Sequence, residues 1–170
     1  FLEGILQHLP ALLSLTLPTN NSFRRVGPGC WTGSSIGWEL EDKEAALRVC
    51  MDTKTRQLTN IEYKLCDSTA NIYLALSSIL ACGLQGILSN LSLRPALRGQ
   101  KEEWKSNPEN EEQLPSTLQE SLECLSKNVF LSEHVLGPEL CQAYIATRRA
   151  ASEKFHSLSL EGEVAMSLNK

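Results

Sequence analysis

Several features that mark large classes of protein are missing from this 170-residue sequence. It has no apolar run near the roughly 20 residues that a membrane-spanning helix needs. It has no C-x-x-C pair, no P-loop, no G-x-G-x-x-G and no recognisable Ser/His/Asp set, so the common zinc, nucleotide and hydrolase signatures are absent. Its formal net charge of −4 gives no general electrostatic attraction for nucleic acid. We therefore predict neither a membrane nor a nucleic acid among its partners.

The composition that remains is that of an ordinary globular domain. Hydrophobic residues make up 42% and charged residues 21%, which is enough for one core with a solvated surface. Several of the cysteines fall inside apolar periodic segments, where a reduced thiol acts as a small hydrophobe. We therefore predict reduced cysteines and a cytoplasmic protein. The six cysteines are Cys30, Cys50, Cys66, Cys82, Cys124 and Cys141.

The start of the sequence is unusual for a complete protein. Phe1 stands directly inside an apolar helical pattern, without an initiator methionine, a basic leader or a signal-peptide cleavage site. We expect the chain to be the C-terminal portion of something longer.

Two long helices are predicted from the spacing of apolar residues. The first covers residues 1–17, with Pro10 expected to kink or split it. His8 is interpreted as a surface or core-edge side chain rather than a metal ligand. The second covers residues 70–91 and is predicted to be a fully buried central helix packed against a sheet. Residues 93–115 are rich in Lys, Glu, Asn and Pro, which predicts a surface loop.

The region 18–66 is predicted to hold a polar turn, a glycine-rich flap loop and the strands. Period-two alternation between turn residues places strands at 36–40, 45–51 and 58–66, joined as an antiparallel meander.

The region 116–170 is predicted to be helical. Ser116 or Thr117 would cap its first helix with help from Glu120, Gly137-Pro138 would begin the next, and residues 160–170 would add a short last one.

Charged side chains gather in the flap-and-strand region. Glu62 stands in a largely apolar strand, and alternation places it on one face with Asn60 and Lys64. A carboxylate beside a cation has two interpretations, a structural ion pair or a metal ligand next to a phosphate-binding cation. Taken alone, the pattern favours the ion pair. Five cations stand in or next to the flap and the charged strands: Arg24, Arg25, Lys43, Arg48 and Lys64.

Three stretches in this order resemble the class I glutamine synthetase superfamily. They are PTNNSFRR at 18–25 followed by Pro28-Gly29, DKEAALRV at 42–49, and IEYK at 61–64 followed by Asp67 and ANIYLA at 70–75. The resemblance implies an α+β fold in which helices flank a curved antiparallel sheet, as the C-terminal portion of a glutamine synthetase-like catalytic domain. It also implies a ring-shaped homo-oligomer whose active sites are shared between subunits.

The resemblance further implies roles for single residues. Arg25 would hold the carboxylate of the substrate glutamate, Arg48 would meet the phosphates of ATP, and Glu62 would bind Mg²⁺ or Mn²⁺. Lys43 and Lys64 stand where the family usually has arginines, so they would keep a charge near ATP but lose the bidentate fork. The family's other metal ligands would lie upstream of Phe1.

Some positions depart from the family pattern. Trp31 stands where ammonia-using members carry a flap glutamate, which resembles members that join organic amines to glutamate. Asn60 replaces an arginine outright, and Ile72 replaces a proline. Two hypotheses therefore stay open. The protein is an ATP-dependent ligase joining ammonia or an organic amine to glutamate through γ-glutamyl phosphate, or it is an inactive relative similar to the lens protein lengsin.

Overall fold

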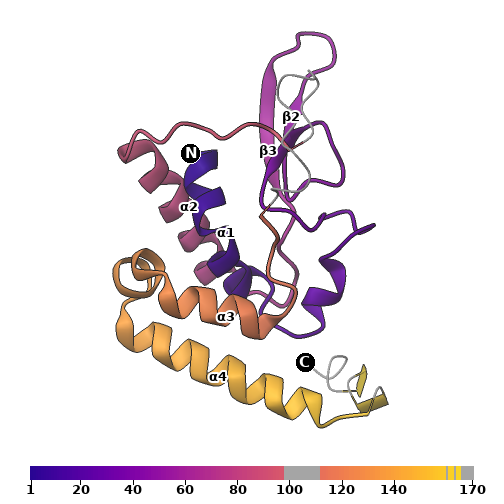
Figure 1. Cartoon of the computed structure of the whole chain (residues 1–170), viewed down its shortest axis with the longest axis vertical. Coiled ribbons are helices and arrows are strands. Elements are labelled where there is room, and N and C mark those ends of the chain that lie inside the picture. Colours follow the sequence, from indigo (N-terminus) through magenta and orange to yellow (C-terminus); the bar gives the residue numbers. More distant parts are fainter. Residues whose placement is uncertain (98–111, 160, 163, 166–170) are drawn as a thin grey trace.

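The computed structural model describes residues 1–97, 112–159, 161–162 and 164–165. Helices and strands are segregated, with the helices on one side and a small sheet beside them (Figure 1), which confirms the predicted α+β class. The elements in chain order are α1 (Leu2–Thr16), η1 (Ser22–Arg25), β1 (Trp38–Leu40), β2 (Leu47–Met51), β3 (Leu58–Tyr63), α2 (Ile72–Leu88), α3 (Leu118–Lys127), η4 (Phe130–Val135) and α4 (Pro138–His156).

Helix α1 is the centre of the core. Almost all its side chains are buried, because α2 and α3 pack against it on two sides. Pro10 does not split the helix, contrary to one of the predicted outcomes, because packing against α2 and α3 holds both halves. Ser121 of α3 also donates to the Pro10 carbonyl at 2.6 Å. His8 lies at the core edge as predicted, with one ring nitrogen 3.2 Å from Gln85 and the other 2.9 Å from Asn128.

The three strands form one sheet in the order β1-β2-β3. The antiparallel pairing of β2 with β3 was predicted, but β1 and β2 run parallel, so the meander was wrong at this pair. Periodicity locates strands without giving their direction. Here the connection turns back at Glu41, whose φ of 59° is left-handed, and returns the chain to the start of β1.

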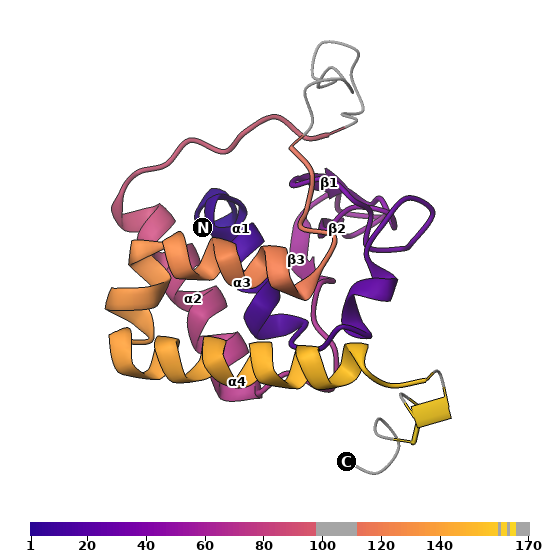
Figure 2. The same cartoon turned by 60° about the horizontal axis from the view of Figure 1, so that its bottom comes forward.

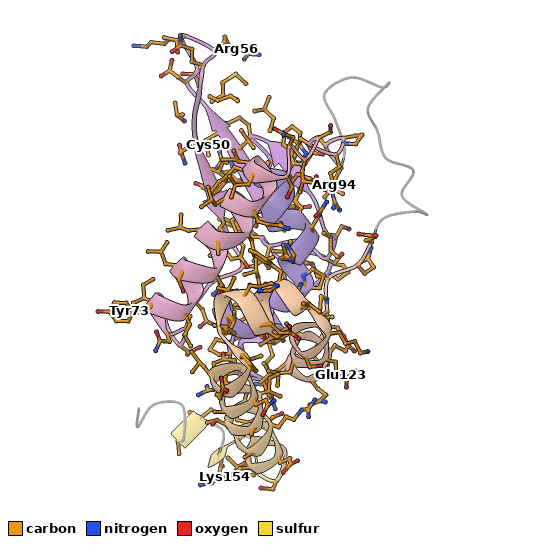
Figure 3. All side chains as sticks on the ribbon, turned by 90° about the vertical axis from the view of Figure 1, so that its left-hand side faces the viewer. Cys50, Arg56, Tyr73, Arg94, Glu123 and Lys154 are labelled. Atoms are coloured by element: carbon orange, nitrogen blue, oxygen red, sulfur yellow. The ribbon has the colours of Figure 1, made fainter. Side chains whose placement is uncertain are left out.

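Helix α2 is not the fully buried element that was predicted, and it packs against α1 rather than the sheet. Gly4 and Gly86 allow the two helices to approach so closely that a Cβ on Gly4 would lie 2.2 Å from the Cys82 carbonyl oxygen. The opposite face of α2 is exposed, and Figure 3 shows Tyr73 pointing away from the helix. Its exposed apolar residues are Ile72, Tyr73, Leu76, Leu80, Leu84, Ile87 and Leu88.

The helices after the loop begin where the sequence predicts. Thr117 caps α3 by accepting from the Glu120 amide at 3.2 Å, and the Glu120 carboxylate accepts from the Ser116 amide at 2.7 Å. Pro138 opens α4, which runs below α3 in Figure 2. The predicted helix at 160–170 falls largely outside the described residues.

The predicted surface loop at 93–115 is described only at its two ends. Both ends join the rest of the fold: Leu97 donates its amide to the Trp38 carbonyl at 3.2 Å, and Leu114 donates to the Ser34 carbonyl at 2.7 Å. Arg94 pairs with Glu3 of α1 at 2.8 Å. These contacts tie the loop ends to β1 and to the start of the core helix.

Candidate functional site

Arg48 and Glu62 stand directly opposite each other on the paired strands β2 and β3. Their side chains meet, with Arg48 Nη1 3.3 Å from Glu62 Oε2. Glu62 does not enter the apolar core, since its side chain is 43% exposed. Cross-strand register therefore brings together a guanidinium and an accessible carboxylate that lie 14 residues apart in sequence.

Glu41 is a second partner of Arg48 that the sequence analysis missed. Its Oε2 lies 2.7 Å from Arg48 Nη2, and its other oxygen accepts from the Met51 amide. These bonds lower the pKa of the Glu41 carboxyl, with the Met51 amide as the larger cause and Arg48 as the next. The hydrogen bond with Glu41 in turn raises the pKa of Arg48. The sequence signal that could have predicted this contact is an acidic turn between two strands, one of which carries an arginine.

The flap, residues 27–33, is closed on itself by backbone hydrogen bonds. Gly27 donates its amide to the Gly33 carbonyl at 3.1 Å, and Gly33 donates to Cys30 at 3.0 Å. Thr32 donates to the Arg25 carbonyl at 2.6 Å, which joins the flap to η1. A hollow of about 230 Å³ lies under the flap, lined by Pro28, Gly29, Cys30, Gly33, Ser34, Ser35, Glu44 and Leu97.

Trp31 projects from the flap with 72% of its surface exposed. Lys43, in the connection between β1 and β2, holds its ammonium 5.9 Å from the centre of the indole ring. That distance is within the range of a cation–π contact. The two residues therefore form one aromatic and cationic surface beside the strands.

Lys64 follows β3 and reaches back to both of these residues. Its ammonium donates to the Trp31 carbonyl and to the Lys43 carbonyl. Burial lowers the pKa of Lys64, an effect that the nearby Glu62 charge opposes. Lys64 was predicted to lie near ATP, and that assignment stays a prediction. In the structure its ammonium contacts main-chain oxygens.

Arg25 ends the 3₁₀ turn η1 and its side chain is exposed. Burial raises the pKa of the Cys66 thiol, and the charge of Arg25 partly offsets that rise. The predicted role of Arg25, holding the carboxylate of the substrate glutamate, stays a prediction.

The donor chemistry at Glu62 fits one ligand of a hard cation such as Mg²⁺. Within the described ranges, no group of three or more His, Cys, Asp or Glu side chains is arranged to hold a metal ion. Arg48 and Lys43 carry positive charge, whereas Asn60, two residues before Glu62 on β3, carries none.

A larger cavity, of about 480 Å³, shares no lining residue with this cluster. It lies between the turn at 18–21 and α4, and Ser152 and Asn20, 2.9 Å apart, are on its wall. We locate the candidate site at the Arg48–Glu62 pair because the charged groups and the flap are there.

A match to a protein-family model identifies the family of this chain. The family model described as "Glutamine synthetase, catalytic domain" matches residues 1–166. The chain belongs to this family. The predicted membership in the glutamine synthetase superfamily is therefore confirmed.

Individual relatives agree with that assignment. A gamma-glutamylpolyamine synthetase, GlnA3 of Streptomyces coelicolor, is 36% identical over 97% of the chain, and glutamine synthetase of Aquifex aeolicus is 32% identical over 86%. A crystal structure of a novel glutamine synthase homolog superposes on 98% of the chain with a TM-score of 0.75 and 29% identity. The chain spans 36%, 32% and 36% of the lengths of these three proteins.

Among the described residues, no helix combines the length and the hydropathy needed to cross a bilayer.

Proposed function

We propose that this chain is the C-terminal part of an ATP-dependent ligase that joins an organic amine to the γ-carboxylate of glutamate. The observation that carries the proposal is the Arg48–Glu62 contact, at 3.3 Å, in a chain of the glutamine synthetase catalytic-domain family. A cation and an accessible carboxylate side by side provide what phosphoryl transfer requires, namely positive charge for the phosphates and an oxygen ligand for a divalent cation.

The reaction has two steps. A carboxylate oxygen of glutamate attacks the γ-phosphorus of ATP, which forms γ-glutamyl phosphate and releases ADP. The amine nitrogen then attacks the γ-carbonyl carbon, loses a proton, and displaces inorganic phosphate. Bound Mg²⁺ or Mn²⁺ would neutralise charge on the transferring phosphoryl group.

The residues of this chain would take different parts in those steps. Glu62 would hold the divalent cation with ligands from elsewhere in the protein. Arg48, anchored by Glu41 at 2.7 Å, would present its guanidinium to the phosphates of ATP, with Lys43 nearby. Arg25 would bind the carboxylate of glutamate. Because Arg48 is already fixed by carboxylates on two sides, little side-chain entropy is lost when the phosphate binds.

Trp31 supports an organic amine rather than ammonia as the acceptor. Its indole can donate only one hydrogen bond and otherwise offers an aromatic face, which suits methylene groups or an alkylammonium cation. With 72% of its surface exposed, the ring is open to a ligand. The name of the Streptomyces coelicolor relative, gamma-glutamylpolyamine synthetase, supports the same class of acceptor.

The same family relationship supports a wider proposal about the whole protein. We expect a ring-shaped homo-oligomer with active sites shared between subunits, located in the cytoplasm. Light scattering of the full-length protein at micromolar concentration measures the first point, and a monomer alone would contradict it.

The enzymatic test uses the full-length protein with ATP, Mg²⁺ and glutamate. Phosphate release is compared between ammonium and a panel of monoamines and polyamines. We expect turnover with one or more organic amines. Trp31→Glu should lower the ratio of kcat/KM for the organic amine to kcat/KM for ammonium. Cys30→Ser, on the same flap, is the matched control and should leave the ratio unchanged.

The outcomes separate the hypotheses. Efficient turnover with ammonium and none with the amines would contradict the argument from Trp31. No phosphate release with any acceptor, in a protein that is folded and oligomeric, would instead favour an inactive, lengsin-like protein. The loss of charge at Asn60 would then be the first change to reverse, as Asn60→Arg.

A further inference from the structure

Lys64 joins two loops that carry the surface proposed to receive the amine. One ammonium donates to the carbonyl of Trp31 in the flap and to the carbonyl of Lys43 in the connection between β1 and β2. The side chains of those same two residues meet at 5.9 Å from ammonium to ring centre. The main-chain atoms of both partners of the cation–π pair are therefore held by a third residue.

A second contact shows that the two loops abut. Gly33, at the end of the flap, has φ of 66°, and a Cβ there would lie 2.3 Å from the carbonyl oxygen of Glu44. The flap backbone thus packs directly on the connection that carries Lys43. Lys64 and Gly33 fix this junction from two places, one by hydrogen bonds and one by close packing.

The position of Lys64 also links the flap to the proposed metal ligand. Lys64 lies two residues beyond Glu62, so the alternation of an extended chain places both side chains on one face. The Lys64 amide donates to the Ala46 carbonyl at 3.2 Å, which continues the pairing with the strand of Arg48. The base of this side chain is therefore set by the sheet, and its tip is set by the loops.

We propose that Lys64 is a positioning residue that fixes the Trp31 flap against Lys43 and so shapes the amine subsite, an inference that rests on the proposed function. A lysine suits this task because its three donors can serve separate carbonyls. Its ammonium is less available to phosphate than that of Lys43. The residue then acts on the choice of amine through Trp31 and does not touch the transferring phosphoryl group.

The test compares Lys64→Met, Lys64→Arg and the control Lys54→Met in the full-length protein. Lys54 is an exposed lysine in the turn between β2 and β3. Amide hydrogen exchange is measured without substrates, which makes this readout independent of activity. We expect Lys64→Met to speed exchange in peptides covering residues 27–44, Lys64→Arg to restore most of the protection, and Lys54→Met to change nothing there.

Exchange in α1 reports whether the variant is folded. Unchanged α1 with faster exchange at 27–44 supports the proposal. Unchanged exchange at 27–44 in Lys64→Met would overturn it.

A kinetic measurement then tests the consequence for the amine. Lys64→Met should raise the KM for the organic amine by about tenfold, because a displaced wall weakens orientation of the substrate, while the KM for ATP stays the same. An equal rise in both would assign Lys64 to the nucleotide and overturn the positioning role. Faster exchange in a protein without any turnover would keep the flap contact and reject the proposed function. Turnover with unchanged exchange would reject the flap contact and keep the function.

Discussion

The pair formed by Arg94 and Glu3 offers a stability prediction whose size follows from its geometry. Arg94 Nη2 lies 2.8 Å from Glu3 Oε1, its Nε lies 3.1 Å from both oxygens, and its amide lies 3.0 Å from Oε2. The Glu3 side chain is only 8% exposed, whereas that of Arg94 is 30% exposed. Glu3 would therefore stay buried if its partner were removed, whereas Arg94 could reach water.

Replacing the arginine should cost more than replacing the glutamate. Arg94→Met leaves a buried carboxylate with a single amide donor, and breaking a buried pair in this way costs about 3 kcal/mol. Glu3→Gln leaves an arginine that can turn towards water and towards Glu112, 3.6 Å away, so we expect a loss of about 1 kcal/mol. The double variant should be more stable than Arg94→Met alone, because it buries no unpaired charge.

The assay is thermal unfolding of the full-length protein at one fixed concentration, since oligomer formation makes the midpoint depend on concentration. Arg149→Met, which removes an exposed arginine from α4, is the matched control and should leave the midpoint within error. A midpoint for Arg94→Met equal to or above that of Glu3→Gln would refute the argument from unequal burial. So would a double variant that unfolds below Arg94→Met.

Three other predictions follow from packing and protonation. Gly4→Ala should destabilise the protein by about 2 kcal/mol or more, because the new Cβ would lie 2.2 Å from the Cys82 carbonyl oxygen. Urea unfolding measures the loss, and Ser77→Ala, on the exposed side of α2, is the control. Burial raises the pKa of Cys82 to about 12, so iodoacetamide at pH 8 should label the partly exposed Cys30 well before Cys82. Mass spectrometry of the peptides measures the two labelling rates, and equal rates would contradict this prediction. The pKa of Glu41 is lowered from 4.5, so its ionised form adds stability above that value that is lost as the pH falls through the lowered pKa. Glu41→Gln should therefore flatten the low-pH side of the thermal midpoint profile, and an unchanged profile would contradict the assignment.

Local sequence signals determined the helices and their ends. The Thr117 cap and the Pro138 start were predicted because capping depends on atoms within four residues of each other. The family, the strand positions and the candidate charges Arg48 and Glu62 were also available from the sequence, since motif spacing and alternation are properties of the chain itself.

The tertiary structure alone decided which partners those elements meet. The sequence pattern did not give the direction of β1, which runs parallel to β2 in the structure. The connection after β1 also carries Glu41, whose carboxylate meets Arg48. The apolar stripe of α2 predicted full burial, but apolar side chains such as Tyr73, Leu80 and Leu88 stay exposed on the face turned away from α1. Lys64 was predicted to be a cation near phosphate, but its ammonium donates to the carbonyls of Trp31 and Lys43, which lie 33 and 21 positions away in the sequence. The periodicity of a segment and the charge of a side chain can be read from the local sequence. The contacts of that side chain depend on how distant loops fold over it.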